Sequence, residues 1–428
     1  MNKEILKEII IANEDFISKE VGIIIEREEV LSLPKLNKVI VFYGVRRSGK
    51  TYVLFNIFKR HKDYALYIDF EDERLIGFEA KDFQKLKEAF LELKPALIGK
   101  ETFFLFDEVQ NVKGWERFSR RVVERENVKV FVTGSSSKMM PKEFHTSLRG
   151  RSWDIEISPF SFREYLRIKN IDVNDKNLVY SQKKALVKKY FSEYLKWGGF
   201  PEVSFLGSEF EKRKVIKEYL EAMFFKDLVE RFNISNITLL DSLKDKIFSS
   251  FSLKFSLTTF YKQYRNKFPF SKDSLFLYSK HLLESMLIFE VRKFSESTYK
   301  RLRNPAKIYL VDTGIARRVT SNDLGRLLEN VVFLELKRRC DEIFYFEEKG
   351  ECDFIIKKNN GRWCTYQVTL DLNEENESRE IGGLLEACAF LGIKEGVILS
   401  YDEETRRKIQ GIEVNIIPVW KWLLVDVE

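Results

Sequence analysis

Histidine and cysteine are scarce in this chain, with three histidines and four cysteines among 428 residues. The cysteines lie far apart and form no C-x-x-C pair; they are Cys340, Cys352, Cys364 and Cys388. This pattern argues against a zinc site, and it is more typical of a reduced intracellular protein than of a disulfide framework. We therefore expect a cytoplasmic protein.

Long apolar runs are also missing, so we expect no membrane span. The first residues, MNKEILKEII, include acidic side chains and no small-residue cleavage site, which argues against a secretory signal. Only 8 prolines are present, and we find no low-complexity tract and no internal repeat. The length then favours a globular chain of about two to four domains.

Neither sign of charge predominates. Lys and Arg total 73, Asp and Glu total 66, and the two signs are interleaved, which leaves a net charge of +7. This balance allows contact with a polyanion, but a solvated mixed-charge surface gives the same numbers. Gln is scarce while Lys, Glu, Ile and Phe are abundant, a composition typical of a heat-adapted organism or of an A·T-rich genome.

A strand, a glycine-bounded loop and a helix follow one another early in the chain. Val39–Tyr43 is a short β-branched and aromatic run that predicts a buried strand, and the apolar spacing of YVLFNIFKR predicts a helix. The loop between them comprises Gly44, Val45, Arg46, Arg47, Ser48, Gly49, Lys50 and Thr51, with Tyr52 directly after it. This is the pattern G-x-x-x-x-G-K-[ST] in its required context, which makes a chance match the weaker interpretation.

The chemistry of such a loop explains its spacing. Its backbone N–H groups surround phosphate oxygens, and the helix N-terminus adds a partial positive charge. Lys50 would reach the β- and γ-phosphates, and the Thr51 hydroxyl would bind Mg²⁺. We therefore expect residues 44–52 to hold a nucleoside triphosphate, and we favour ATP because the chain has no N-K-x-D guanine motif.

Two acidic residues follow a later buried strand, in the segment ETFFLFDEVQ. Thr102–Phe106 predicts the strand, and Asp107 and Glu108 stand at its carboxyl end, as in a Walker B motif. Asp107 would face the Mg²⁺ held by Thr51, and Glu108 would polarise the attacking water. A solvated turn is the alternative for the two carboxylates.

Further candidates follow the next strand, VKVFVTGSSS. In ATPases of the AAA+ kind a polar residue here touches the γ-phosphate, which makes Ser135 or Ser136 a candidate; a Gly/Ser turn is the alternative. Arg149 and Arg151 in LRGR are placed like an arginine finger, which a neighbouring subunit often supplies, so a homo-oligomer is a candidate state. A surface salt bridge is the alternative for these arginines.

Eight segments occur in an order that resembles one family. They are GVRRSGKT, LFDEVQ, VTGSSS, LRGR, SPFSFREYL, WGGFP (Trp197–Pro201), KIYLVDTGIA (Lys307–Ala316) and LLENVVFLEL (Leu327–Leu336). Over nearly its whole length the chain resembles prokaryotic, often archaeal, AAA-type ATPases with an uncharacterised nuclease-like C-terminal domain. The resemblance implies an α/β fold that contains a parallel P-loop sheet.

We expect four parts: a P-loop domain at 1–164, a helical lid at 165–235, a winged-helix-like module at 236–303 and a nuclease-like α/β domain at 304–428. In the third part, three helices precede a strand, and Ser271–Leu287 would be the recognition helix. Five cations there could meet DNA phosphates: Lys262, Arg265, Lys267, Lys272 and Lys280. A module used only for packing is the alternative.

The last part reads as helix, three strands, helix and strand, which is similar to the PD-(D/E)xK nuclease fold. Such enzymes bind Mg²⁺ with acidic side chains, and the matching positions are Glu329, Asp353, Gln367 and Thr369. Gln367 lacks a charge and Thr369 replaces the catalytic lysine, for which only a Lys357 or Lys358 reaching the same face would compensate. We therefore predict a degenerate nuclease site that is weak or inactive.

The sequence thus predicts an ATPase with ATP and Mg²⁺ as ligands. Two functions remain open. Turnover is coupled to action on DNA, or the protein is a nucleotide-dependent switch that recruits protein partners.

Overall fold

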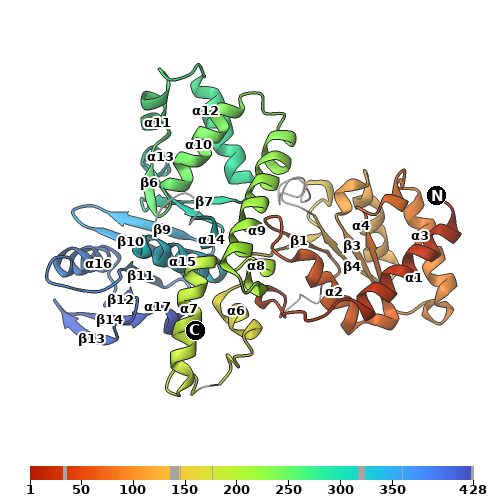
Figure 1. The fold of residues 1–428 in the computed structure, drawn as a ribbon, viewed down its shortest axis with the longest axis horizontal. Coiled ribbons are helices and arrows are strands. Elements are labelled where there is room, and N and C mark those ends of the chain that lie inside the picture. The colour runs from red at the N-terminus through yellow and green to blue at the C-terminus, as the bar shows by residue number, and fades with distance from the viewer. Residues whose placement is uncertain are drawn as a thin grey trace. The chain divides into compact units, whose positions relative to one another are not determined.

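The computed structural model describes residues 1–31, 36–134, 144, 146–175, 177–316, 323–358 and 360–425. The chain divides into two compact units, Met1–Ser158 and Pro159–Glu428. Figure 1 shows that each unit has its own sheet with helices around it. No described helix combines the length and the apolar character that crossing a bilayer requires.

The first unit contains a five-stranded sheet whose order is β2-β3-β4-β1-β5. The strands are β1 (Val39–Tyr43), β2 (Ala65–Asp69), β3 (Thr102–Asp107), β4 (Val128–Thr133) and β5 (Ser152–Glu156). Every neighbouring pair is parallel. The predicted α/β class with a parallel P-loop sheet is therefore confirmed.

Helices cover both faces of this sheet. They are α1 (Lys3–Lys19), α2 (Lys50–Arg60), α3 (Asp82–Leu93) and α4 (Trp115–Arg125), with 3₁₀ turns η1 (Glu28–Val30), η2 (Lys62–Tyr64), η3 (Glu73–Leu75), η4 (Pro95–Leu97) and η5 (Val109–Asn111). In β1, Val39 and Val41 join one buried apolar cluster with α1, α3 and α4, while Ile40 and Phe42 join another with α2. Burial on both faces explains why these strands read as continuous apolar runs.

The second unit contains a mixed nine-stranded sheet in the order β13-β14-β12-β11-β10-β9-β7-β8-β6. The strands are β6 (Leu253–Phe255), β7 (Ile288–Lys293), β8 (Ala306–Leu310), β9 (Ile343–Glu347), β10 (Glu351–Lys357), β11 (Trp363–Val368), β12 (Glu395–Ser400), β13 (Thr405–Ile409) and β14 (Ile412–Pro418). Its central part is an antiparallel run, β9-β10-β11, followed by β12 parallel to β11.

The helices of the second unit are α6 (Phe162–Ile168), α7 (Lys183–Trp197), α8 (Pro201–Phe205), α9 (Glu209–Ala222), the π-helix η6 (Met223–Glu230), α10 (Ile237–Ser249), α11 (Leu257–Tyr264), α12 (Lys272–Glu284), α13 (Thr298–Arg303), α14 (Thr313–Ala316), α15 (Leu324–Arg339), α16 (Glu377–Leu391) and α17 (Val419–Trp422). On one face of the sheet, α16 supplies a separate buried cluster. The cluster on the other face joins α6, α7 and α15. The segment expected as a lid therefore packs within the second unit, and its role over a nucleotide stays a prediction.

Candidate functional site

The P-loop lies between β1 and α2, as predicted. Gly49 precedes α2 with a φ of 96°, and Gly44 has a φ of 149°. A Cβ on Gly44 would lie 2.2 Å from the carbonyl oxygen of Ile157, so only glycine fits there. Lys50 Nζ donates hydrogen bonds to the carbonyl oxygens of Gly44 and Val45, at 3.1 and 3.0 Å. The lysine is thus folded back over its own loop.

Arg27 holds the loop from outside, a role that the sequence analysis did not find. Its Nη1 donates to the carbonyl oxygen of Ser48 at 2.8 Å, and its Nη2 donates to that of Ser158. The guanidinium is buried, with Glu29 3.7 Å away. Because Ser48 and Ser158 are far apart in sequence, no local pattern could have indicated this contact.

Asp107 ends β3 as predicted and is completely buried beside the P-loop helix. Its carboxylate accepts hydrogen bonds from the hydroxyls of Tyr67, at 3.0 Å, and of Thr133. The Thr51 hydroxyl lies close enough to lower the pKa of Asp107. Burial raises the pKa of Asp107, while the Thr133 hydrogen bond opposes that shift. The structure therefore brings Asp107 and Thr51 together, as a Walker B carboxylate and a P-loop hydroxyl must be if they are to share Mg²⁺.

Thr133 also connects the two acidic residues of the motif. Its hydroxyl accepts the backbone N–H of Glu108 at 3.2 Å while it donates to Asp107. Glu108 has a left-handed φ of 48° and accepts a hydrogen bond from Gln110. The residue expected to sense the γ-phosphate, Ser135 or Ser136, lies outside the described residues.

A third carboxylate lies next to this pair. Asp69 ends β2 directly beside Asp107 in the register of the parallel sheet. Burial, with the Asp107 charge as a smaller cause, raises the pKa of Asp69 to about 6. Acidic groups thus gather at the carboxyl edge of the sheet, where ligands bind in open α/β folds.

The two candidate arginines lie in different surroundings. Arg151 forms an ion pair with Glu124 of α4, which is the surface salt bridge weighed as its alternative role. Arg149 has a left-handed φ of 52° and lines a hollow beside α4. A catalytic role of either residue stays a prediction.

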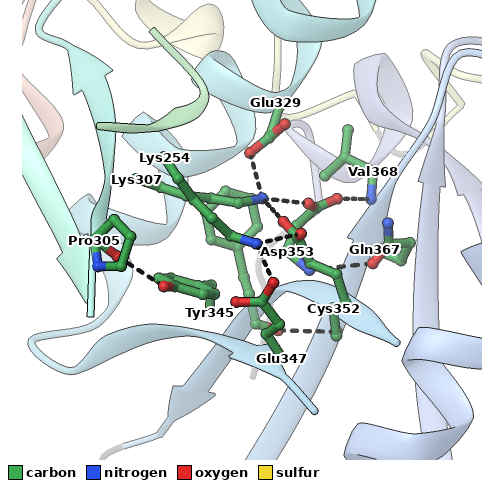
Figure 2. A network of polar contacts seen from close by, with 12 residues as sticks. Lys254, Pro305, Lys307, Glu329, Tyr345, Glu347, Cys352, Asp353, Gln367 and Val368 are labelled. Atoms are coloured by element: carbon green, nitrogen blue, oxygen red, sulfur yellow. Dashed lines mark hydrogen bonds and ion pairs between the residues drawn. The ribbon is translucent and has the colours of Figure 1, made fainter. Parts of the chain in front are cut away.

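The nuclease-like positions form a buried cluster around a lysine that the sequence analysis did not select (Figure 2). Lys307 Nζ on β8 lies 2.7 Å from Asp353 Oδ1, 2.7 Å from Glu351 Oε1 and 3.2 Å from Glu329 Oε1. Tyr309, two residues further along β8, donates to the same Glu329 oxygen at 2.7 Å. The only feature of the sequence that could have indicated this role of Lys307 is its position at the start of the apolar run KIYLV.

The other predicted members point elsewhere. Gln367 accepts the backbone N–H of Asp353 at 3.1 Å and donates to Glu380 of α16. The Thr369 hydroxyl donates to the carbonyl oxygen of Asp371 at 2.9 Å. Lys357 is exposed, with its ammonium 5.6 Å from the centre of the Trp363 ring.

The residues of this cluster do not fit a divalent metal. The Lys307 ammonium already lies between the carboxylates, and the amide oxygen of Gln367 is bonded to backbone. Among the residues that the structure describes, no three His, Cys, Asp or Glu side chains are arranged to hold a metal ion. The pKa of Lys307 is raised, chiefly by Asp353 and Glu329 against the opposing effect of burial, so the ammonium stays charged.

Three further segments from the family resemblance lie close together in the second unit, two of them at the buried Asp312. Asp312 accepts the backbone N–H groups of Gly199 and Gly314, at 2.6 and 2.8 Å. On α15, Asn330 pairs with both the N–H and the C=O of Leu310, at 2.8 and 3.0 Å. The segments WGGFP, KIYLVDTGIA and LLENVVFLEL therefore converge in space, where they fix β8 against α7 and α15.

The first unit has the fold and site of a P-loop ATPase domain of the AAA type, and a family model described as an AAA domain matches residues 36–166. A second model, for a domain of unknown function (DUF8612), matches residues 188–325. The uncharacterized protein MJ1544 of Methanocaldococcus jannaschii is 36% identical over 441 residues, which cover 99% of this chain and 96% of the relative. The chain belongs to the same family as this archaeal protein.

Other similarities are more distant. An uncharacterized protein of Haemophilus influenzae is 27% identical over 420 residues, covering 93% of this chain and 97% of that protein. Among solved structures, the Walker-type ATPase PABY2304 of Pyrococcus abyssi has a TM-score of 0.44 at 16% identity, covering 69% of this chain and 96% of that one.

Proposed function

We propose that this protein hydrolyses ATP in a Mg²⁺-dependent reaction at the P-loop of its first unit. The observation that carries the proposal is the contact of buried Asp107 with Thr51, at the start of α2. Mg²⁺ bound there would neutralise charge on the β- and γ-phosphates. Lys50 would exchange its two loop carbonyls for phosphate oxygens, and Glu108 would orient the attacking water.

Two features of the loop support a phosphate ligand. Arg27 fixes the carbonyl of Ser48, so the loop is held in shape before a ligand arrives. The Ser48 hydroxyl is buried and has no hydrogen-bond partner in the described part of the chain. An unpaired buried hydroxyl is costly, and a phosphate oxygen would satisfy it.

Phosphate release from ATP in the presence of Mg²⁺ tests the proposal. Lys50→Ala should lower turnover by at least about 100-fold, because one positive group that stabilises the transferring phosphoryl is lost. Glu108→Gln should lower turnover by a similar factor but retain ATP binding. Lys62→Ala, a lysine just beyond the other end of α2, is the matched control. Full turnover by Lys50→Ala would refute the assignment.

An arginine from a neighbouring subunit is part of the proposal. If Arg149 or Arg151 acts on the ATP of another copy, activity per subunit should rise with protein concentration. Constant specific activity across a wide dilution series would exclude this role.

The Lys307 cluster favours a second, compatible function, in which the C-terminal region recruits a partner and does not cut DNA. An ammonium that contacts three carboxylates occupies the position where a PD-(D/E)xK nuclease would need its metal ion. Supercoiled plasmid incubated with Mg²⁺ or Mn²⁺ should stay intact. Nicking that is lost in Asp353→Ala would overturn this view.

The segment from α10 to β8 has the element order helix-strand-helix-helix-strand-helix-strand, which matches a winged helix except that α13 stands between the last two strands.

Binding of DNA by this segment has less support. Of the five cations expected to meet phosphates, three already contact other side chains: Lys267 lies over the Tyr264 ring at 4.7 Å, Lys272 over the Tyr261 ring at 5.2 Å, and Lys280 beside Glu284 at 3.6 Å. The exposed face of α12 also carries Phe276 and Leu277, which are 54% and 49% exposed. These features favour a protein-binding or packing role for α12.

A further inference from the structure

A hollow of about 900 Å³ opens on the first unit, at the N-terminus of α3, along α4 and at the turn that precedes β5. We call it the α3/α4 groove. It is lined by six cationic side chains, Lys81, Lys113, Arg117, Arg120, Arg121 and Arg149, and by one carboxylate, Glu116. The whole chain is close to balanced, with 73 cations against 66 anions, so this concentration of one sign is local.

Four of these six cations are available for a ligand. The other two are engaged in ion pairs, Arg121 with Glu126 and Lys81 with Glu79. The remaining four, Lys113, Arg117, Arg120 and Arg149, have no ion pair to any residue that the structure describes. Lys113 and Arg117 are exposed. Unpaired like charges repel one another, and an anionic ligand would relieve that repulsion.

The arrangement fits a chain of phosphates better than a single small anion. Arg117, Arg120 and Arg121 follow one another at helical spacing, so they share one face of α4. Lys113 extends this row beyond the start of the helix, and Arg149 adds a cation from a separate segment. Arginine forks match phosphate oxygens in pairs, and a row of them follows an extended polyanion. We propose that the α3/α4 groove binds the phosphodiester backbone of a nucleic acid.

The groove is directly connected to the candidate ATP site. Asp107 and Glu108 lead through η5 to Lys113, and α4 begins at Trp115. A nucleic-acid backbone bound to Lys113 and Arg117 would therefore contact the same segment of the chain that carries both acidic residues. By thermodynamic linkage, nucleic acid and ATP should then change each other's affinity by the same factor. This coupling, unlike the binding itself, rests on the proposed ATPase function.

A salt titration of the affinity for fluorescently labelled duplex DNA tests the proposal, with anisotropy as the readout. The triple variant Lys113→Ala/Arg117→Ala/Arg120→Ala should bind at least about 10-fold more weakly. The slope of log K against log salt should also fall in magnitude by about 2–3, because each lost phosphate contact removes about 0.9. Arg125→Ala, on α4 but outside the groove lining, is the matched control and should keep the wild-type slope.

Two further arms keep the test decisive. If the triple variant does not fold, as judged by circular dichroism, Arg117→Ala and Arg117→Lys replace it, and only the alanine should lose affinity and slope. Duplex RNA and single-stranded DNA show which nucleic acid is preferred, since all three share the phosphodiester backbone. Lys272→Ala/Lys280→Ala tests the winged-helix-like segment as the competing surface.

The outcomes separate this proposal from the ATPase assignment. Wild-type protein that binds no nucleic acid, or a triple variant that binds as well as wild type, overturns the groove. Loss of binding in Lys272→Ala/Lys280→Ala alone overturns it as well. ATP hydrolysis is measured on the same preparations without nucleic acid, so an inactive wild type refutes the ATPase while the binding result still stands.

Discussion

The ammonium of Lys307 on β8 lies 2.7 Å from Oδ1 of Asp353 on β10, and both side chains are buried. Lys307→Met keeps much of the side-chain length but leaves Asp353 and Glu329 without their cation. We expect the free energy of unfolding of the second unit to fall by about 3–5 kcal/mol, as when one partner of a buried ion pair is removed. Chemical denaturation followed by tryptophan fluorescence measures this change.

Lys307→Arg is the matched control, since it keeps the charge and should lose less stability. Mg²⁺ should not raise the thermal midpoint of the wild-type second unit, because Lys307 occupies the space between the clustered carboxylates and no other metal site is found among the residues that the structure describes. A Lys307→Met protein as stable as wild type would mean that the cluster contributes nothing to the fold.

Glu329 should make stability depend on pH. Burial raises its pKa to about 7, from an unfolded value near 4.5, against the opposing effect of Lys307. At a pH between these two values, Glu329 is protonated in the folded state and ionised in the unfolded state. Its contribution to the free energy of unfolding therefore falls as pH rises through about 7. We expect a loss of about 2.5–3 kcal/mol between pH 5 and 8, because about two pH units of that range lie below the folded pKa and each is worth about 1.4 kcal/mol.

Glu329→Gln isolates this effect, because an amide oxygen still accepts the Tyr309 hydroxyl but does not titrate. The difference in unfolding free energy between wild type and variant should change across that pH range in the stated direction. A difference that is flat with pH would show that Glu329 titrates alike in both states.

Thr133 should affect hydrolysis more than binding. Thr133→Val removes the hydroxyl that joins Asp107 to the backbone of Glu108 and keeps the shape of the side chain. We expect turnover of ATP to fall about 10- to 100-fold, because the carboxylates lose their fixed orientation. The dissociation constant for ATP should change much less, and Thr133→Ser should recover most of the activity. Equal losses in Thr133→Ser and Thr133→Val would exclude the hydroxyl as the cause.

Gly198 is required by its neighbour Asp312. It has a φ of 73°, and a Cβ there would lie 1.7 Å from Asp312 Oδ1. Gly198→Ala should therefore destabilise the second unit by about 2–4 kcal/mol, since both the backbone and the buried carboxylate would have to shift. Gly207→Ala is the control, because a Cβ on Gly207 would have no atom of a described neighbour within 4 Å. Thermal unfolding of the two variants measures the difference.

Elements with a local signature could be predicted from the sequence. Val39–Tyr43 was expected with the bounds that β1 has, because a strand buried on both faces reads as one continuous apolar run. Asp107 and Thr51 were also expected to meet, because the two motifs around them define where each lies on the sheet. In the structure the Thr51 hydroxyl lies close enough to Asp107 to lower its pKa, and their sharing of a metal ion stays a prediction.

Residues that act through distant contacts could not be predicted. Lys307 is separated from Asp353 by 46 positions and lies on β8, which the sequence analysis did not assign as a strand. Arg27 is separated from Ser158 by 131 positions. Thr133 reaches Asp107 only through the register of neighbouring strands. Such partners depend on sheet order, which side-chain patterns along one segment do not encode.

The pairing of β7 with both β8 and β9 has a practical consequence. The expected boundary between residues 303 and 304 lies between β7 and β8, which are adjacent strands of one sheet. A fragment that begins at residue 304 would expose β8 and β9 along edges that β7 normally covers, and free edges of this kind promote aggregation. Expression of the whole segment from Pro159 onward avoids such a cut, because it keeps the continuous sheet intact.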